Sequence, residues 1–97
     1  MKKQDPVSFM GEKLAQLDSP QEGVLFLQSF FTAKERETLY HRFQIIQLLL
    51  EGKSQRDIAQ VLGISLSQVS RGSAELQFGS GAHFFEAFFE KTKHDCI

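Results

Sequence analysis

The sequence predicts an all-α protein, and three observations lead to that prediction. Patterns that start helices recur along the chain, with Ser or Thr followed three residues later by an acidic or amide side chain. Glycines stand at two points where such helices should stop. No stretch shows the alternation of apolar and polar residues that marks a half-buried strand. Its 97 residues, 41% of them hydrophobic, are expected to form a single domain over residues 1–97.

Six helices are expected, and most of them begin at a side chain that can cap the first turn. The expected capping residues are Ser19, Thr32, Ser54 and Ser65. Gly52 and Gly63 are expected to end the third and fourth helices, because glycine adopts the left-handed conformation at little cost. The predicted helices span residues 6–17, 20–30, 33–51, 54–62, 65–76 and 81–93.

Two of these helices carry more apolar surface than a solvent-facing helix needs. The third is apolar around most of its circumference, with one stripe at helical spacing formed by Leu39, Phe43, Ile46 and Leu50. The last helix holds four of the ten phenylalanines, Phe84, Phe85, Phe88 and Phe89. This surplus favours a dimer, in which the phenylalanines are core or interface contacts. A monomer with a few exposed phenylalanines remains the alternative.

Residues 54–76 have the spacing of a helix-turn-helix, in which the second helix enters the major groove of DNA. Ala59 lies where two closely crossing helices leave room only for a small side chain, and Gly63 makes the turn. Four apolar side chains should clamp the helices together, namely Ile58, Leu62, Ile64 and Val69. A plain helical hairpin inside a bundle is the alternative.

The charge of the chain agrees with DNA binding only in the middle. The net charge is −1, yet residues 34–72 hold six Lys and Arg against four Asp and Glu. Affinity for phosphates should therefore be modest for one subunit and strongly dependent on salt. A dimer would double it and place two reading heads on half-sites about 34–36 Å apart.

The expected DNA contacts lie at the starts of the two helices. The second helix has no Arg or Asn there for a bidentate base contact, so it must rely on small polar groups, apolar contact, bridging water and DNA shape. Arg56 suits a phosphate or a guanine edge, although an exposed arginine is more often merely solvated. The predicted DNA-binding residues are Lys53, Gln55, Arg56, Ser65, Leu66, Ser67 and Ser70.

The run TAKERETLYHRFQIIQLLLEGKSQRDIAQVLGISLSQVSRGS, residues 32–73, resembles the tryptophan repressor family. The specific parts are the ER-E-x-L opening, the position of Arg42, the SQR start of the fourth helix and the closing RGS. The family is itself a standard example of helix-turn-helix recognition. The resemblance implies a six-helix protomer in an intertwined homodimer, whose core comes from residues 6–51 and 81–93. It also implies that L-tryptophan binds as a corepressor between that core and the reading head.

The resemblance assigns roles to particular residues of the ligand pocket. Arg42 and Arg71 are expected to flank the ligand ring and hold its carboxylate, with help from Thr32, while Ile46 lines the ring and Gly72 leaves room for it. Backbone carbonyls of residues 29–31 in the partner chain, which include Ser29 and Phe31, are expected to receive the ammonium group. Without the resemblance, Arg42 would be assigned to a salt bridge with Glu35 or Glu37, and Arg71 to a phosphate contact.

Several positions depart from the family pattern. One residue is missing around Gly52-Lys53-Ser54, and Ser29 replaces an apolar residue. Gln68 stands where the family usually has threonine, and Glu75 stands where it has serine. The carboxylate of Glu75 either pairs with the ammonium of the ligand or neutralises one of the two arginines.

We therefore expect a transcriptional repressor that binds operator DNA as a dimer, with L-tryptophan as its corepressor. Two alternatives remain open: a regulator of the same fold that responds to another molecule or to none, and a protein-interaction module that docks through its Phe-rich last helix. An enzyme is not expected, because His41, His83 and His94 lie on separate elements with no acid or nucleophile at catalytic spacing.

The remaining features suit a cytoplasmic protein without a metal or cofactor. Cys96 is the single cysteine, so no disulfide can form within the chain. His94 and Cys96 are too few to hold a metal ion. The opening MKKQDPVSFMGEK lacks the apolar run of a signal peptide, and no stretch is long and apolar enough to span a membrane.

Overall fold

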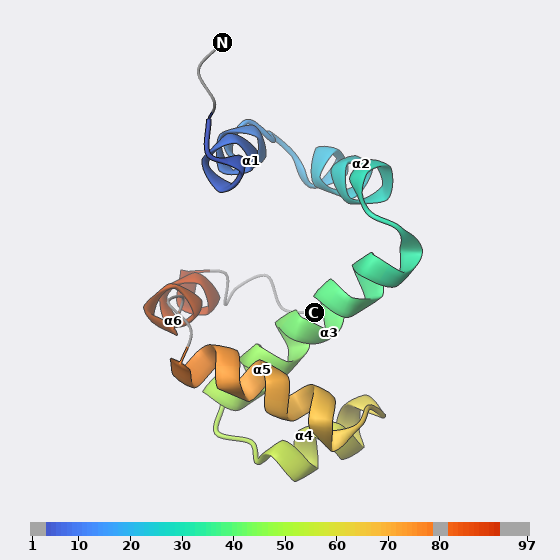
Figure 1. The fold of residues 1–97 in the computed structure, drawn as a ribbon, viewed down its shortest axis with the longest axis vertical. Helices are drawn as coiled ribbons and strands as arrows, with labels where there is room; N and C mark the ends of the chain where they lie inside the picture. Colours follow the sequence, from blue (N-terminus) through green and yellow to red (C-terminus); the bar gives the residue numbers. More distant parts are fainter. Residues whose placement is uncertain (1–3, 79–81, 92–97) are drawn as a thin grey trace. The chain divides into compact units, whose positions relative to one another are not determined.

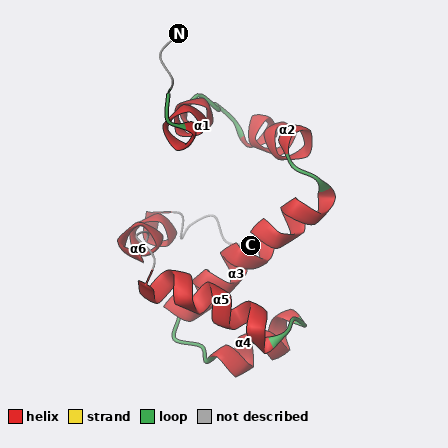
Figure 2. Ribbon diagram, viewed as in Figure 1, coloured by secondary structure: helices red, strands yellow, loops and turns green. Residues whose placement is uncertain are grey.

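The computed structural model describes residues 4–78 and 82–91, without the side chains of residues 75–78 and 82 (Figure 1). Helices account for the regular structure of this described part, and none of it is strand (Figure 2). The prediction of six helices in an all-α fold is confirmed, with every described boundary within two residues of the expected one. The helices are α1 (Pro6–Ala15), α2 (Pro20–Phe30), α3 (Ala33–Leu50), α4 (Gln55–Leu62), α5 (Leu66–Phe78) and α6 (Ala82–Lys91).

The chain divides into two compact units, Met1–Arg36 and Glu37–Ile97. The first holds α1, α2 and the first turn of α3, and the second holds the rest of α3 with α4, α5 and α6. No described helix is both long enough and apolar enough to cross a membrane. That the two units form one domain stays a prediction.

Caps fix where the helices of the first unit begin. The Asp5 carboxylate accepts the N–H of Ser8 at 3.0 Å, and Ser19 Oγ accepts the N–H of Glu22 at 3.2 Å. The Glu22 carboxylate reaches one residue further back than a capping box requires, because it accepts the N–H of Asp18 at 2.6 Å. These bonds satisfy N–H groups for which the helix offers no acceptor.

Thr32 and Glu35 form the reciprocal capping box that the sequence predicts for α3. Thr32 Oγ1 accepts the N–H of Glu35 at 3.1 Å, and the Glu35 carboxylate accepts the N–H of Thr32 at 2.8 Å. Just beyond it, Arg36 Nη1 donates to the carbonyl of Phe31 at 2.7 Å, which ties the first turn of α3 to the end of α2.

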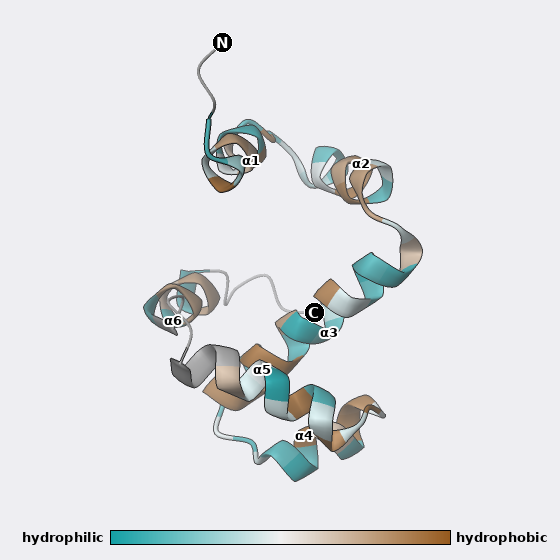
Figure 3. Ribbon diagram, in the orientation of Figure 1, coloured by the Kyte–Doolittle hydropathy of each residue, from teal (hydrophilic) through white to brown (hydrophobic). Residues whose placement is uncertain are grey.

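The described residues of the first unit, 4–36, have apolar faces but form no buried core. No residue of α1 or α2 is buried, although both helices carry large apolar side chains (Figure 3). Val7 is 72% exposed and Phe30 is 74% exposed. Phe26 contacts Phe30 and Phe31 with ring centroids 4.8 and 6.5 Å apart, which covers only part of this surface. Helices this short gain most of their stability from packing, so these faces need a partner surface.

The second unit has a core at the helix-turn-helix, as the sequence predicts. Ile45 from α3, Ile58 from α4 and Val69 from α5 are buried together. Partly buried side chains surround them, contributed by Leu48, Leu49, Ala59, Leu62 and Ile64. Gly63 ends α4 in the left-handed region at φ 67°, and the N–H of Ile64 donates to the carbonyl of Ala59 at 3.1 Å.

Helix α6 packs beside α5 and brings aromatic side chains to α3. The ring of Phe43 lies 6.1 Å from that of Phe88 and 6.2 Å from that of Phe89, at the tilted and edge-on angles that aromatic pairs prefer. Phe88 and Phe89 are partly buried by this contact, and whether they also meet a second copy of the chain stays a prediction. Phe84 stacks on Phe88 but keeps 62% of its surface exposed.

The capping box of α3 predicts a measurable titration. The backbone N–H of Thr32, and after it the hydroxyl of Thr32, hold the pKa of Glu35 below its usual 4.5. The depressed pKa contributes stability that is complete above the unfolded value and is lost as the pH falls through the folded value. Thr32→Ala removes the hydroxyl and keeps the N–H. Its Glu35 should therefore titrate at a higher pH than in the wild type, measured by carboxyl-carbon NMR. An identical titration in the two proteins would show that the hydroxyl does not lower the pKa of Glu35.

Candidate ligand pocket and DNA-reading surface

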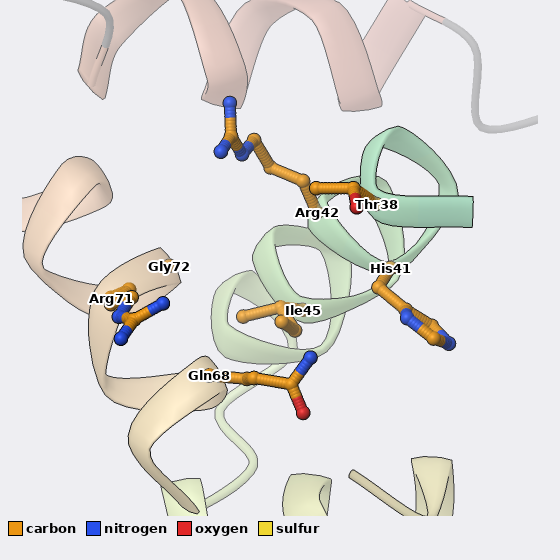
Figure 4. Close-up of a pocket in the computed structure, with 7 residues that line it drawn as sticks. All are labelled: Thr38, His41, Arg42, Ile45, Gln68, Arg71 and Gly72. Atoms are coloured by element: carbon orange, nitrogen blue, oxygen red, sulfur yellow. The ribbon is translucent and has the colours of Figure 1, made fainter. Parts of the chain in front are cut away.

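A pocket of about 360 Å³ opens where α5 crosses α3 in the second unit. Its floor is Ile45 and the backbone of Gly72, and polar side chains surround it (Figure 4). Among the described residues that line it, none carries a carboxylate. The lining residues are Thr38, His41, Arg42, Ile45, Gln68, Arg71 and Gly72.

The crossing that shapes the pocket depends on the absence of a side chain at position 72. A Cβ built on Gly72 would lie 2.6 Å from Cγ2 of Ile45, which is closer than such atoms approach in proteins. Both residues are buried. The branched Ile45 side chain therefore fits against the backbone of α5, which brings the two helices together.

Helical spacing explains how each helix supplies its share of the lining. Thr38, Arg42 and Ile45 are separated by four and three residues along α3. Gln68, Arg71 and Gly72 occupy one face of α5 in the same way. The two guanidinium groups thus come from different helices, and both side chains are exposed.

Gln68 has two structural tasks at once. It closes a capping box at the start of α5, since its N–H donates to Ser65 Oγ at 3.2 Å and its amide oxygen accepts the N–H of Ser65 at 3.0 Å. Its side chain also lines the pocket. The cap thereby fixes a polar side chain in the wall of the pocket.

The structure brings together four of the residues predicted for the ligand, Arg42, Arg71, Gly72 and Gln68. Ile46, which was predicted to line the ligand ring, is not among the lining residues of this pocket, and its role toward a ligand stays a prediction. Ile46 is 2% exposed and does not line the pocket, whereas its neighbour Ile45 does, because α5 crosses α3 at Ile45.

Sequence reasoning missed Thr38, His41 and Ile45 as lining residues. A signal was present, since each lies three or four residues from another lining residue of α3. Ser29, Phe31 and Thr32 belong to the first unit, and their roles toward a ligand stay predictions. Glu75 lies in α5, but its side chain is outside the described part of the structure.

The predicted DNA-reading surface is exposed at the starts of α4 and α5. Lys53 and Arg56 are exposed, and so are the four predicted residues of α5 and its cap, which are Ser65, Leu66, Ser67 and Ser70. The serine hydroxyls already have partners within the protein: Ser65 Oγ lies 3.1 Å from Ser67 Oγ, and Ser70 Oγ donates to Gln55. The hydroxyl oxygens of Ser67 and Ser70 can still accept a further hydrogen bond.

Gln55 differs from the other predicted DNA contacts, because its amide joins α4 to α5. The amide oxygen accepts the hydroxyl of Ser70 at 2.9 Å, and the amide nitrogen donates to Ser73 Oγ at 3.1 Å. Ser73 is 5% exposed, so this bond satisfies a buried hydroxyl. The structure thus gives Gln55 a positioning role in the helix-turn-helix, and its contact with DNA stays a prediction.

The chain thus combines a helix-turn-helix with a pocket against its second helix, and comparison with known protein families agrees with this arrangement. Residues 6–93 match the family model described as Trp repressor protein. The chain belongs to the Trp repressor family. Membership of this regulatory family confirms the prediction that the protein is not an enzyme. No solved structure gives a significant match.

Individual relatives carry the name Trp operon repressor homolog. One from Chlamydia caviae is 40% identical over 67 residues, which is 68% of this chain and 66% of the relative. One from Vibrio vulnificus is 42% identical over 57 residues, 58% of this chain and 56% of the relative. One from Vibrio parahaemolyticus is 43% identical over 67 residues, 68% of this chain and 64% of the relative. In these three relatives the match covers between 56% and 66% of the relative's length, which is less than two thirds.

In the Trp repressor fold of this chain, we expect the crossing at Gly72 to tolerate no added methyl group. Gly72→Ala should lower the free energy of unfolding by about 1–3 kcal/mol, the usual cost of overpacking a core. Denaturant titration followed by circular dichroism measures it. Ile45→Ala in the same background should relieve the clash, so the two losses should sum to more than the loss in the double variant. Full additivity would place the clash elsewhere.

The bridge made by Gln55 predicts a second loss of stability. Gln55→Ala leaves the buried Ser73 hydroxyl without its partner, which should cost about 1–2 kcal/mol. The matched control is Gln60→Ala, because Gln60 is an exposed residue of the same helix. That control should stay within about 0.5 kcal/mol of the wild type. Equal effects at the two positions would show that the bridge contributes nothing.

Proposed function

We propose that this protein is a DNA-binding transcriptional repressor that binds operator DNA as a homodimer and takes L-tryptophan as its corepressor. The observation that carries the proposal is the pocket at the crossing of α3 and α5. It joins the helix that would enter the DNA groove to the core of the second unit, and each helix contributes one arginine.

The lining of the pocket suits a ligand that has an aromatic ring and a carboxylate. Guanidinium groups bind carboxylates through paired N–H donors and also stack on aromatic rings. Arg42 and Arg71 supply two such groups, while Ile45 and the bare backbone of Gly72 supply an apolar floor. The names of the relatives, which mention the Trp operon, support tryptophan as that acid.

A ligand at this crossing would act on DNA binding through the position of α5. The same helix bears Arg71 and Gly72 in the pocket and the exposed Ser67 and Ser70 near its start. A ligand that contacts both α3 and α5 stabilises the arrangements of the reading helix in which both contacts form. The ligand would thus raise the population of protein able to bind DNA.

The homodimer is supported by the first unit, whose helices bury no residue. The exposed apolar side chains on α1 and α2 include Val7, Phe9, Met10, Leu14, Val24, Leu25 and Phe30. A second copy of the chain would cover them with equivalent apolar surface. Two copies would also bring two reading heads to one operator, which doubles the number of phosphate contacts.

The ligand can be tested by its own fluorescence, because the chain contains no tryptophan. Titrating L-tryptophan with the protein should raise the fluorescence anisotropy of the ligand. Arg42→Ala and Arg71→Ala should each weaken this binding at least about tenfold, since each removes a charge-assisted hydrogen bond. Unchanged anisotropy with millimolar protein would exclude tryptophan as the ligand.

Arg56→Ala is the matched control, because Arg56 is exposed on α4 and does not line the pocket. It should bind tryptophan like the wild type and bind DNA more weakly. The probe is a duplex enriched from a random pool by the tryptophan-saturated protein. Equal affinity for that duplex with and without tryptophan at fixed salt would instead favour a regulator of this fold that needs no such ligand.

A further inference from the structure

The amide of Gln68 has a fixed orientation in the pocket wall. A backbone N–H can only donate, so the atom of Gln68 that meets the N–H of Ser65 must be the amide oxygen. The same oxygen lies 3.2 Å from Ser65 Oγ and accepts its hydroxyl. The amide nitrogen is therefore on the opposite side, and Figure 4 shows it pointing toward Ile45.

This orientation places N–H donors beside the apolar floor of the pocket. Ile45 is buried and lines the pocket beside the Gln68 amide. In the proposed pocket the guanidinium groups of Arg42 and Arg71 would flank the aromatic ring and hold the carboxylate. The Gln68 amide is then left facing the edge of the ring rather than the acid group.

The edge of an unsubstituted indole ring is a poor partner for the N–H groups of Gln68. Indole offers one N–H donor and no acceptor in the plane of its ring. An N–H group that loses water on ligand binding and gains no acceptor weakens the complex. Tryptophan would therefore bind through its acid group and ring face, with the Gln68 amide unmatched.

We propose that the pocket prefers an aromatic amino acid that carries a hydrogen-bond acceptor on the ring edge facing Gln68, and that Gln68 is the residue that determines this preference. The inference rests on the proposed ligand pocket and refines the chemical class of its ligand. The acceptor would receive an N–H of Gln68 while the capping bonds to Ser65 remain in place.

The test compares pairs of ligands that differ only in the acceptor. Cyano-L-tryptophan and ethynyl-L-tryptophan have nearly the same shape, but only the nitrile accepts a hydrogen bond. Each pair is measured by competition against L-tryptophan fluorescence, with the substituent moved around the open carbons of the benzene ring. At the position that faces Gln68, the cyano compound should bind the wild type at least about fivefold more tightly than its ethynyl partner.

The decisive variant is Gln68→Glu, which keeps the acceptor that caps α5 and removes both N–H donors. Its cyano-to-ethynyl preference should fall to one or below. The matched control is Gln60→Glu, which adds the same charge at an exposed position that does not line the pocket. This control should keep the wild-type preference.

Three results would overturn the proposal. One is equal affinity for the two members of every cyano and ethynyl pair, which would mean that the Gln68 amide donates to the ligand carboxylate or to water. Another is a cyano preference that persists in Gln68→Glu. The third is binding of tryptophan but of none of the substituted compounds, which would mean that no room exists at that edge. Failure of tryptophan itself to bind would remove the proposed ligand pocket as well, so the two failures are distinguishable.

Discussion

The contact between the Ile45 side chain and the bare backbone of Gly72 is the constraint on which the second unit depends. It sets how closely α5 approaches α3, and the buried cluster of Ile45, Ile58 and Val69 forms around that approach. The pocket lies at the same crossing, since Ile45 and Gly72 both line it. Stability and the proposed ligand binding would therefore depend on one pair of residues, so a change there is expected to alter both.

Hydrogen bonds orient the helices that the apolar contact brings together. The buried cluster holds the helices together but does not fix the rotation of α5 about its axis, because dispersion and burial depend little on orientation. The amide of Gln55 supplies direction through hydrogen bonds to Ser70 and Ser73 on α5. The rotation of α5 about its axis decides which side chains face a DNA groove. A hydrogen-bonded amide between α4 and α5 would thus affect the proposed DNA binding through the orientation of α5.

The sequence predicts local features such as helix ends well, but it does not predict which residues meet where two helices cross. Helix starts at Thr32 and Ser65 and the stop at Gly63 depend on residues a few positions apart, so local reasoning located them. Local reasoning could not show that Ile45 lines the pocket, because this depends on the crossing point of two helices, which is set by Gly72, more than twenty-five residues away. The bridge made by Gln55 could not be predicted for a similar reason, since nothing near it in the sequence shows that Ser73 is buried beneath it. Its contact with DNA stays a prediction. His41 could have been found, because it lies four residues before Ile45 on a helix face already chosen for Arg42.

The side chain of Gln68 links the cap of α5 to the pocket. Its amide oxygen is held by the cap of α5, so its amide nitrogen faces the pocket only when the first turn of α5 is formed. A ligand that accepts from that nitrogen would favour the folded first turn, which also displays Ser65 and Ser67 at the predicted DNA surface. Binding energy at the pocket edge would then order the start of the reading helix, in addition to any effect of the arginines on its position. A ligand that contacts only the arginines and Ile45 would lack this second effect, because neither arginine takes part in the described cap of α5.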